Sequence, residues 1–396
     1  MNPILIERPD VVRLSALPPL ALYVHVPWCV RKCPYCDFNS HERKGPLPED
    51  AYVERLLEDL EGLLPSIWGR RVISIFIGGG TPSLFAPASI DKLLSGVRAR
   101  VQLDPTAEIT LEANPGAVEA QRFAGFAAAG VNRISVGVQS FDERMLAALG
   151  RIHSGTDARR AVEAALEAIG NVNLDLMYGL PGQDLDGARS DIATGIAIGV
   201  PHLSAYQLTL EPNTAFWSKP PALPVDDAIA DMQQAVEAAL GAAGFEHYET
   251  SAFARPGRRC RHNLNYWEFG DYLGIGAGAH GKVSFPDRVT RHERIKQPLE
   301  YLQRKATLSR ETVVPPAELA FEFMLNALRL VEGFPITLFQ ERTGLPFASI
   351  QRTVDKAAAE GLLERDLARV RPTERGRLFM NELMQRFIPD GNKDRR

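Results

Sequence analysis

Short apolar, β-branched runs alternate with segments of helical periodicity from residue 21 to about residue 210, and this alternation constrains the fold most. Six runs read as strands, at residues 22–26, 72–77, 108–111, 133–138, 172–177 and 203–208. Helical segments lie between them, near 49–64, 88–101, 117–129, 155–169 and 184–198. Such alternation builds a parallel sheet with right-handed crossovers. We therefore expect an α/β fold, a partial (β/α)6 barrel of the TIM type, with an open doubly wound sheet as the competing arrangement.

Residues of chemical character stand at or just beyond the carboxyl ends of these six runs. In chain order they are Cys29, Cys33 and Cys36, then Gly78 to Pro82, then Glu112 and Asn114, then Gln139 and Ser140, then Asp175, then Tyr206 and Gln207. Parallel α/β folds build their active sites from the carboxyl ends of the strands. The pattern therefore predicts one site at the barrel mouth, although it does not separate a barrel from an open sheet.

The remainder of the chain predicts smaller units. Prolines interrupt regular structure at 217–224. A helix over 225–243, a strand over 245–250 and an irregular segment over 255–300 follow, and from about residue 315 a helical unit with a short β-wing resembles a winged helix. The predicted divisions are an N-terminal segment (1–20), the barrel (21–215), a barrel extension (216–310) and a C-terminal helical, winged-helix-like domain (311–390).

Charge and hydropathy exclude several classes of protein. The net charge is −4, and basic and acidic residues nearly balance over 340–396, so we expect no nucleic-acid partner. No apolar run reaches the roughly 18 residues that span a bilayer. The N-terminal segment has charges inside its apolar stretch, unlike a secretory signal. Four cysteines are too few for a disulfide scaffold, so we expect a cytoplasmic protein.

Three of the four cysteines fall within eight residues, as Cys29, Cys33 and Cys36 in a C-x3-C-x2-C pattern. A structural zinc site takes four ligands, and only Asp37 and His41 stand nearby as a fourth. Three thiolates suit a [4Fe–4S] cluster with one iron left open, which the amine and carboxylate of S-adenosylmethionine could fill. Buried cysteines without a metal are the alternative interpretation.

C-x3-C-x2-C after the first strand of such a barrel resembles the radical S-adenosylmethionine superfamily. Gly78-Gly79-Gly80-Thr81-Pro82 is similar to its glycine motif, where the backbone approaches the methionine amino group. Glu112 follows in Leu-Glu-Ala-Asn-Pro, where a carboxylate would bind ribose hydroxyls or the amino group. A plain turn and a solvated carboxylate are the simpler readings of these two motifs.

The chain resembles more closely the oxygen-independent coproporphyrinogen dehydrogenase branch. The similar segments begin at Tyr23 (YVHVP), Gly137 (GVQS), Leu149 (LGRIH) and Asp175 (DLMYGLPGQ). The resemblance implies that the cofactor contacts are Tyr23, Tyr35, Gly79, Gly80, Thr81, Glu112, Gln139, Arg151 and Asp175. Gln139 as a helix cap and Arg151 as a surface ion pair are the alternatives.

Two departures from that branch instead resemble its haem chaperone (HemW-type) relatives. Phe38 stands where the dehydrogenase has a fourth cysteine, and only about twenty residues precede the first strand. The chain also carries His262-Asn-Leu-Asn-Tyr266-Trp267, which is similar to the H-N-x-x-Y-W motif implicated in haem binding in that branch.

The haem motif also has a reading from its residues alone. Imidazole is a common axial ligand of haem iron, Tyr266 and Trp267 could stack on the porphyrin, and arginines 258, 259 and 261 could pair with propionates. A hydrogen-bonded structural His262 beside packed aromatic rings is the alternative. Cys260, the leftover cysteine, is not expected to be a cluster ligand.

The resemblance implies a haem chaperone that holds haem, a [4Fe–4S] cluster and S-adenosylmethionine. It would pass haem to haem-requiring acceptor proteins, membrane-bound respiratory subunits among them, and could dimerise on loading. The alternative is an oxygen-independent coproporphyrinogen III dehydrogenase that decarboxylates propionates by radical chemistry. A non-catalytic metal-binding or nucleic-acid-binding module that uses the winged helix is disfavoured by the near-neutral charge. Whether S-adenosylmethionine is cleaved stays open.

Overall fold

The computed structural model describes residues 11–116 and 121–389, and a large mixed sheet organises these ranges. Each of the six expected strands is present: β1 (Leu20–Val26), β4 (Val72–Gly79), β5 (Leu103–Ala113), β6 (Arg133–Gln139), β7 (Val172–Tyr178) and β8 (His202–Gln207). They pair in parallel in that order. Carboxyl ends of neighbouring strands therefore share one edge, as the alternation predicted.

A seventh parallel strand, β11 (Asp271–Ile275), pairs with the other side of β1, from Leu20 opposite Asp271 to Val24 opposite Ile275. The prediction of an irregular segment over 255–300 was therefore wrong. The described elements there are α10 (Arg261–Trp267), β11, β12 (His280–Phe285), β13 (Arg288–Arg294) and α11 (Pro298–Gln303). Glycines interrupt the apolar pattern by which strands are recognised in a sequence. Gly274 is required in β11 because a Cβ there would collide with the backbone of His280.

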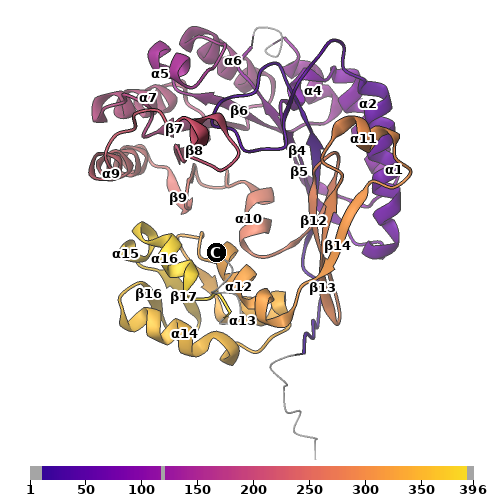
Figure 1. Ribbon diagram of the computed structural model, residues 1–396, viewed down its shortest axis with the longest axis vertical. Coiled ribbons are helices and arrows are strands. Elements are labelled where there is room, and N and C mark those ends of the chain that lie inside the picture. Colours follow the sequence, from indigo (N-terminus) through magenta and orange to yellow (C-terminus); the bar gives the residue numbers. More distant parts are fainter. Residues whose placement is uncertain (1–10, 117–120, 390–396) are drawn as a thin grey trace, which may run out of the picture.

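Antiparallel strands extend both edges of the sheet. Beyond β11 lie β12, β13 and β14 (Leu308–Val313), and beyond β8 lie β10 (Ala252–Ala254) and β9 (Glu246–Glu249). In the described ranges β14 and β9 form the two ends, so the sheet does not close. Figure 1 shows the parallel strands in an arc with the crossover helices on its outer side, which is a partial barrel and not a doubly wound sheet.

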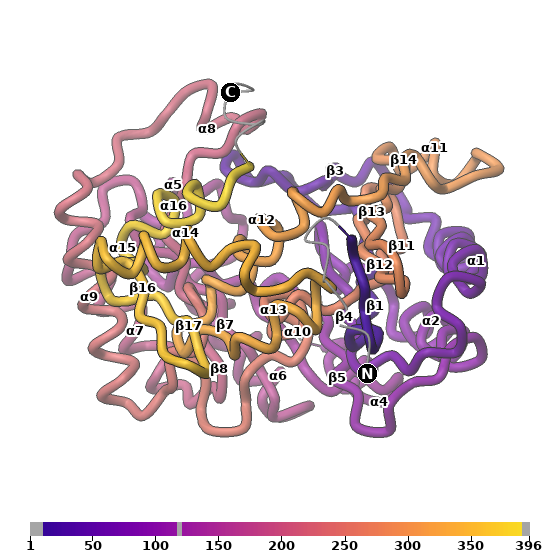
Figure 2. Tube along the Cα trace, turned by 90° about the horizontal axis from the view of Figure 1, so that it is seen from below, coloured from indigo at the N-terminus to yellow at the C-terminus, as the bar shows by residue number. Residues whose placement is uncertain are grey.

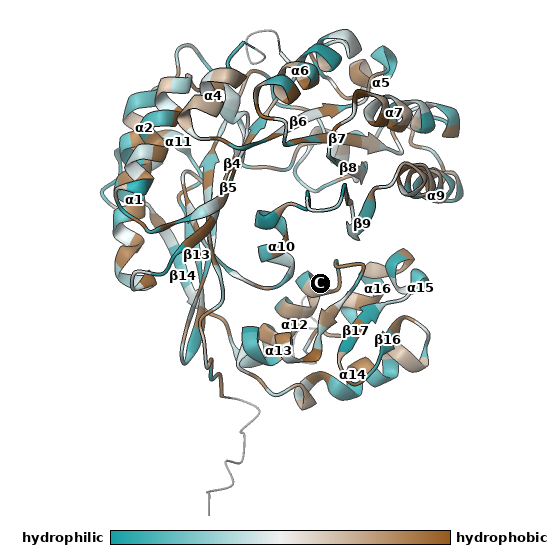
Figure 3. Cartoon of the chain, turned by 180° about the vertical axis from the view of Figure 1, so that it is seen from behind, coloured by the Kyte–Doolittle hydropathy of each residue, from teal (hydrophilic) through white to brown (hydrophobic). Residues whose placement is uncertain are grey.

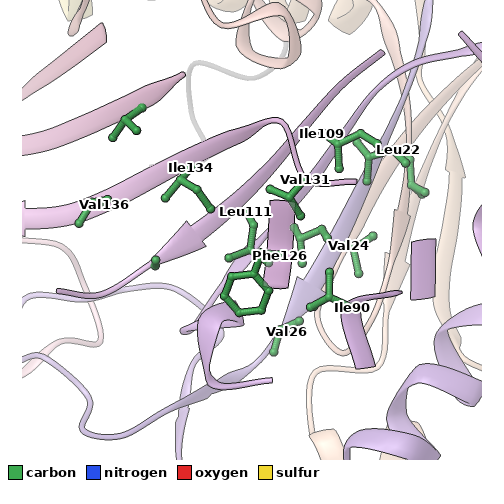
Figure 4. Close-up of a cluster of buried hydrophobic side chains, with 14 of the residues drawn as sticks. Leu22, Val24, Val26, Ile90, Ile109, Leu111, Phe126, Val131, Ile134 and Val136 are labelled. Atoms are coloured by element: carbon green, nitrogen blue, oxygen red, sulfur yellow. The ribbon is translucent and has the colours of Figure 1, made fainter. Parts of the chain in front are cut away.

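The outer helices and the sheet share the main core. The helices that follow the strands are α1 (Glu49–Ile67), α2 (Pro87–Arg98), α4 (Phe123–Ala129), α5 (Glu143–Ala148), α6 (Gly155–Ala168), α7 (Leu185–Ile198) and α9 (Asp226–Ala242). Figure 4 shows Val24 and Leu111 of the sheet with Ile90 and Phe126 of two helices, and each is fully buried. In Figure 3 the outer helices carry both hydrophilic and hydrophobic segments, as expected where only one face covers a sheet.

The C-terminal unit forms its own core of aromatic rings. Its elements are α12 (Pro316–Ala327), β15 (Phe334–Pro335), α13 (Ile336–Thr343), α14 (Ala348–Ala359), β16 (Leu363–Arg365), β17 (Arg369–Pro372), α15 (Glu374–Leu378) and α16 (Met380–Gln385). Phe323 lies 5.0 Å from Phe334 and 5.2 Å from Phe339 between ring centroids. These elements gather beside α10 in both Figure 1 and Figure 2. Helices α12, α13 and α14 and the small sheet β15–β17 follow the predicted order of helices and wing, whereas the predicted last helix divides at Phe379 into α15 and α16.

None of the helices in residues 11–116 and 121–389 combines the length and the apolar character that crossing a membrane requires.

Candidate functional site at the barrel mouth

The cysteine loop follows β1 directly and is closed at its base by a short ladder. Strand β2 (Trp28–Cys29) pairs in parallel with β3 (His41–Glu42). Inside the loop the Cys36 amide donates to the Cys33 carbonyl at 3.2 Å, which places a tight turn between the second and third cysteines. The loop therefore has a defined shape that holds three thiols near the carboxyl end of the first strand.

A cavity of about 390 Å³ lies between this loop and the carboxyl ends of the strands, and we call it the cysteine cavity. The sequence-predicted residues that line it are Cys29, Cys33, Tyr35, Cys36, Gly79, Gly80, Thr81, Glu112, Gln139, Arg151 and Asp175. Its volume is in the range of cavities that bury a small cofactor. Tyr23 lines a neighbouring cavity instead, where its hydroxyl lies 2.9 Å from His25 Nδ1.

The glycine segment at the end of β4 lies against the cysteine loop without room for side chains. A Cβ on Gly79, whose φ is +115°, would lie 2.5 Å from the His25 ring. A Cβ on Gly80 would lie 2.6 Å from the Trp28 carbonyl oxygen. Only glycine meets both demands, because it lacks a Cβ and tolerates positive φ. Bare backbone consequently forms this wall of the cysteine cavity.

Glu112 at the end of β5 is connected to the glycine segment. Its Oε2 accepts a 3.0 Å hydrogen bond from the Gly79 amide. Burial, together with the nearby charge of Asp175, raises the pKa of Glu112 to about 8. A carboxyl group with a pKa in this range can exchange a proton, or accept hydrogen bonds from an ammonium or hydroxyl group, near neutral pH.

Arg151 links the cysteine loop to three strand ends. Its Nη1 lies 3.6 Å from Cys33 Sγ, and its Nη2 donates to Asn114 Oδ1 at 2.8 Å and to the Gly137 carbonyl at 2.5 Å. Asn114 Nδ2 in turn donates to Thr81 Oγ1 at 2.8 Å. The Nε atom of Arg151 is buried and has no partner in the described residues. The guanidinium thus places a positive charge beside a thiol and keeps one donor unused at the cavity.

Gln139 and Asp175 stand at the ends of β6 and β7. The β6–β7 register shifts between Gly137 and Gln139, and Gln139 has a φ of +72°, an uncommon backbone state for a non-glycine residue. Asp175 accepts hydrogen bonds from Ser135 at 3.0 Å and from Asn173 at 2.8 Å, while burial raises its pKa. The local backbone strain and the buried carboxyl are both typical of a binding site.

The donor set fits an iron–sulfur cluster better than a single metal ion. In the described ranges no three or more His, Cys, Asp or Glu side chains are grouped so that they could hold one ion. Cys29, Cys33 and Cys36 nevertheless line one cavity, an arrangement suited to a group wider than one ion. Burial raises the pKa of the Cys29 and Cys36 thiols, and coordination to iron would offset that cost by binding the thiolate form.

Several polar residues of the cysteine cavity were not among the predicted site residues. They lie inside strands and point toward the barrel interior: Arg133, Ser135, Asn173 and Ser204. Arg133 is 2% exposed, and its Nε has no partner in the described residues. The available signal was a charged or polar residue inside an otherwise apolar strand, which a barrel-like sheet directs inward.

The H-N-x-x-Y-W segment forms α10, and its histidine is buried away from the cysteine cavity. His262 is 1% exposed, its Nδ1 lies 3.0 Å from Ser74 Oγ, and its ring stacks on Phe76 with centroids 5.0 Å apart. Burial, and then the charge of Arg133, lowers the pKa of His262 to about 3. Asn263 is the residue of α10 that lines the cysteine cavity. Haem contact by His262 stays a prediction, and this arrangement surrounds the ring with protein.

Some of the residues near His262 in the sequence are packed inside the protein, and others lie at its surface. Trp267 lies under the Arg329 guanidinium at 4.5 Å, and its Nε1 is buried without a partner in the described residues. Tyr266 lines the same second cavity as Tyr23. Arg259 pairs with Glu246 and Glu332, while Arg258 and Arg261 are exposed. Cys260 is fully buried, and burial raises the pKa of its thiol to about 12. It does not line the cysteine cavity, unlike the three cysteines of the loop.

Comparison with known proteins agrees with the fold and with the cysteine loop. Residues 23–192 match the Radical SAM superfamily and residues 314–379 match the HemN C-terminal domain. The three-cysteine loop at the mouth of a partial barrel is thus that of a radical SAM protein.

Relatives that match nearly the whole chain identify its family within the superfamily. The chain is 51% identical over 376 residues to the heme chaperone HemW of Escherichia coli strain K12, covering 94% of this chain and 99% of that protein. It is 48% identical to the heme chaperone HemW of Haemophilus influenzae, covering 95% and 100%. The chain therefore belongs to the HemW family of the radical SAM superfamily.

More distant relatives share the same architecture. The chain is 37% identical to radical S-adenosyl methionine domain-containing protein 1, mitochondrial, of Mus musculus, covering 95% of this chain and 88% of that protein. The structure of coproporphyrinogen III oxidase (HemN) from Escherichia coli matches with a TM-score of 0.79 at 24% identity, covering 94% of this chain and 90% of that chain. The latter likeness concerns the fold.

Proposed function

We propose that the protein is a haem chaperone of the radical SAM type, which holds haem and delivers it to haem-requiring acceptor proteins. One observation carries the proposal: a chain 51% identical to a heme chaperone HemW places three thiols, a bare glycine wall, Glu112 and Arg151 around one cavity. Delivery in the cytoplasm to respiratory subunits at the membrane, with dimerisation on loading, is the setting we propose.

In this proposal Cys29, Cys33 and Cys36 hold a [4Fe–4S] cluster, which supplies one-electron chemistry when bound. The Gly79–Gly80 backbone would receive the methionine end of S-adenosylmethionine, and Glu112 would accept hydrogen bonds from its amino group or ribose. Arg151 holds positive charge beside Cys33. Gln139, Asp175 and Tyr35 complete the walls. The cavity walls would shield part of the surface of the bound groups from water.

The competing activity is radical decarboxylation of coproporphyrinogen. Phe38 favours the chaperone, because it stands where the dehydrogenase branch has a fourth cysteine. It lines the cysteine cavity and offers no thiol there.

Two measurements on the same anaerobically reconstituted protein test the proposal. Haemin titration should give a stoichiometric complex with a Soret band, and an anaerobic assay with coproporphyrinogen III should give no protoporphyrinogen. Substantial turnover in the second assay, or no haem complex in the first, would overturn the assignment.

A further inference from the structure

A second cavity of about 690 Å³ lies on the other side of residues 37–40 from the cysteine cavity. The two share wall residues, namely Asp37, Phe38, Ser40, Gly79 and Glu112. We call the second one the tyrosine cavity, because Tyr23, Tyr266 and Tyr272 line it. Tyr266 and Tyr272 meet edge to face with centroids 4.4 Å apart. Helix α10 therefore presents Tyr266 to open space while its His262 is enclosed.

Three histidines line the tyrosine cavity, and they differ in how their ring nitrogens are used. His25 has both nitrogens engaged, Nδ1 at 2.9 Å from the Tyr23 hydroxyl and Nε2 at 2.9 Å from the Asn39 carbonyl oxygen. His41 Nε2 lies 3.3 Å from Asn39 Oδ1. His280, the first residue of β12, is exposed, and across residues 11–116 and 121–389 its ring shows no hydrogen bond. His280 is thus the imidazole with both nitrogens open.

Positive charges without carboxylate partners also line the tyrosine cavity. Lys32 Nζ donates to the carbonyl oxygens of Phe38 and Ser40, each at 3.2 Å. Lys296 lines the same cavity and stands two residues after β13. Neither lysine has an ion pair with another described residue. Asp37 and Glu112 are the carboxyl groups on these walls. Ammonium groups that lack a carboxylate partner in the protein are suited to bind carboxylates of a ligand.

Asn39 fixes the position of His280 relative to the cysteine loop. Its Nδ2 donates to the carbonyl oxygens of Ala277 and Lys296, each at 2.8 Å. Gly278, with a φ of +81°, has no room for a Cβ against the Asn39 amide. Asn39 stands three residues after Cys36, so the segment that carries His280 is held by the same loop that carries the thiols.

Resting on the proposed function, we infer that the tyrosine cavity is the haem site, with His280 as the iron ligand. The tyrosine rings flank the porphyrin, and Lys32 and Lys296 pair with the propionates. The volume suits a ligand of this size, and the shared wall places haem directly beside the cysteine cavity.

Haemin titration of the full-length protein, followed by Soret absorbance, tests this inference with two matched variants. His280→Ala should weaken haemin binding at least tenfold and shift the Soret band, because the iron loses its ligand. His41→Ala removes an imidazole from the same cavity and should keep the parent affinity within about twofold. Far-UV circular dichroism checks that both variants are folded, which the exposure of His280 favours.

Protoporphyrin IX without iron provides a second arm, because it has the same ring and carboxylates but needs no axial ligand. The parent and His280→Ala should bind it equally, whereas Lys32→Ala/Lys296→Ala should bind it less tightly. If His280→Ala binds haemin with the parent affinity and spectrum, or if His262→Ala alone abolishes the Soret band while folded, the inference is wrong and the proposed function stands. If the parent itself binds no haemin, both are wrong.

Discussion

The cysteine loop and helix α10 carry the two motifs with the most chemical character, and the structure treats them in opposite ways. The loop places three thiols on a cavity together with Glu112 and Arg151. Helix α10 encloses His262 between Phe76 and Tyr266 and bonds it to Ser74. The difference teaches that a motif residue serves a ligand only where its polar atoms face open space. We therefore expect substitutions in the loop to reduce cofactor loading strongly, and substitutions in α10 to reduce the stability of the fold strongly.

The largest effect is expected from the loop cysteines. Cys29→Ala, Cys33→Ala or Cys36→Ala should each abolish loading of the cluster, since three thiolates are the minimum that leaves one iron open. Iron and acid-labile sulfide per chain, with visible absorption, measure the result. Cys260→Ala is the matched control and should load normally, because Cys260 is bonded to Glu108 outside the cavity. Normal loading of a loop variant would remove the basis of the comparison.

His262→Ala tests the other half of the comparison. Removing a buried ring that stacks on Phe76 and bonds to Ser74 should cost about 2–4 kcal/mol of unfolding free energy. Urea unfolding measures the loss. His280→Ala, which removes an exposed ring, should change stability by less than about 0.5 kcal/mol. Equal costs for the two variants would contradict the assignment of His262 to packing.

Glu112 makes the stability of the folded protein depend on pH. Its pKa is raised from 4.5 to about 8 in the folded protein, mainly by burial. Between these values the folded protein holds a proton that the unfolded chain has released, so stability falls as pH rises. From about pH 5 to about pH 8 the parent should lose about 3–4 kcal/mol more than Glu112→Gln. Parallel stability curves for the two proteins, measured by urea unfolding, would show that the shift is absent.

The smallest effect is expected at Phe38, on the wall that the two cavities share. Phe38 is 59% exposed, so Phe38→Ala should change the unfolding free energy by less than about 0.5 kcal/mol and leave iron content unchanged. Thermal unfolding and iron analysis on the same sample measure both. A loss of iron would contradict this expectation and would mean that the Phe38 ring protects the cluster.

The sequence predicted the sheet well where strands are apolar and separated by helices. The strands β1 and β4 to β8 were found because most of their residues are buried on both faces and contrast with amphipathic helices. β11 and β12 were missed because glycines at 274, 276 and 278 obscure the strand pattern, and the pairing of β11 with β1 spans most of the chain. Pairings this distant leave no local signal.

The site was predictable to the extent that its residues follow strand ends. The three cysteines, the glycine segment and Glu112 share that position, so parallel pairing alone brings them to one edge. Arg133 and Asn39 were not identified, because their roles depend on which way a strand faces and on hydrogen bonds to residues more than 200 positions away. The open nitrogens of His280 and the enclosed ring of His262 are likewise tertiary facts.

The place of β1 between β4 and β11 has a consequence for biosynthesis. Leu20 pairs with Asp271, so a nascent chain exposes one edge of its first strand until roughly 250 further residues have left the ribosome. At about 5–20 residues per second this lasts on the order of 10–50 s. An unpaired edge invites aggregation during that time. Because the cysteine loop follows β1 directly, its thiols emerge early, but the last wall residue of their cavity is Asn263 in a chain of 396 residues, so insertion of iron and sulfide belongs to the second half of synthesis or later.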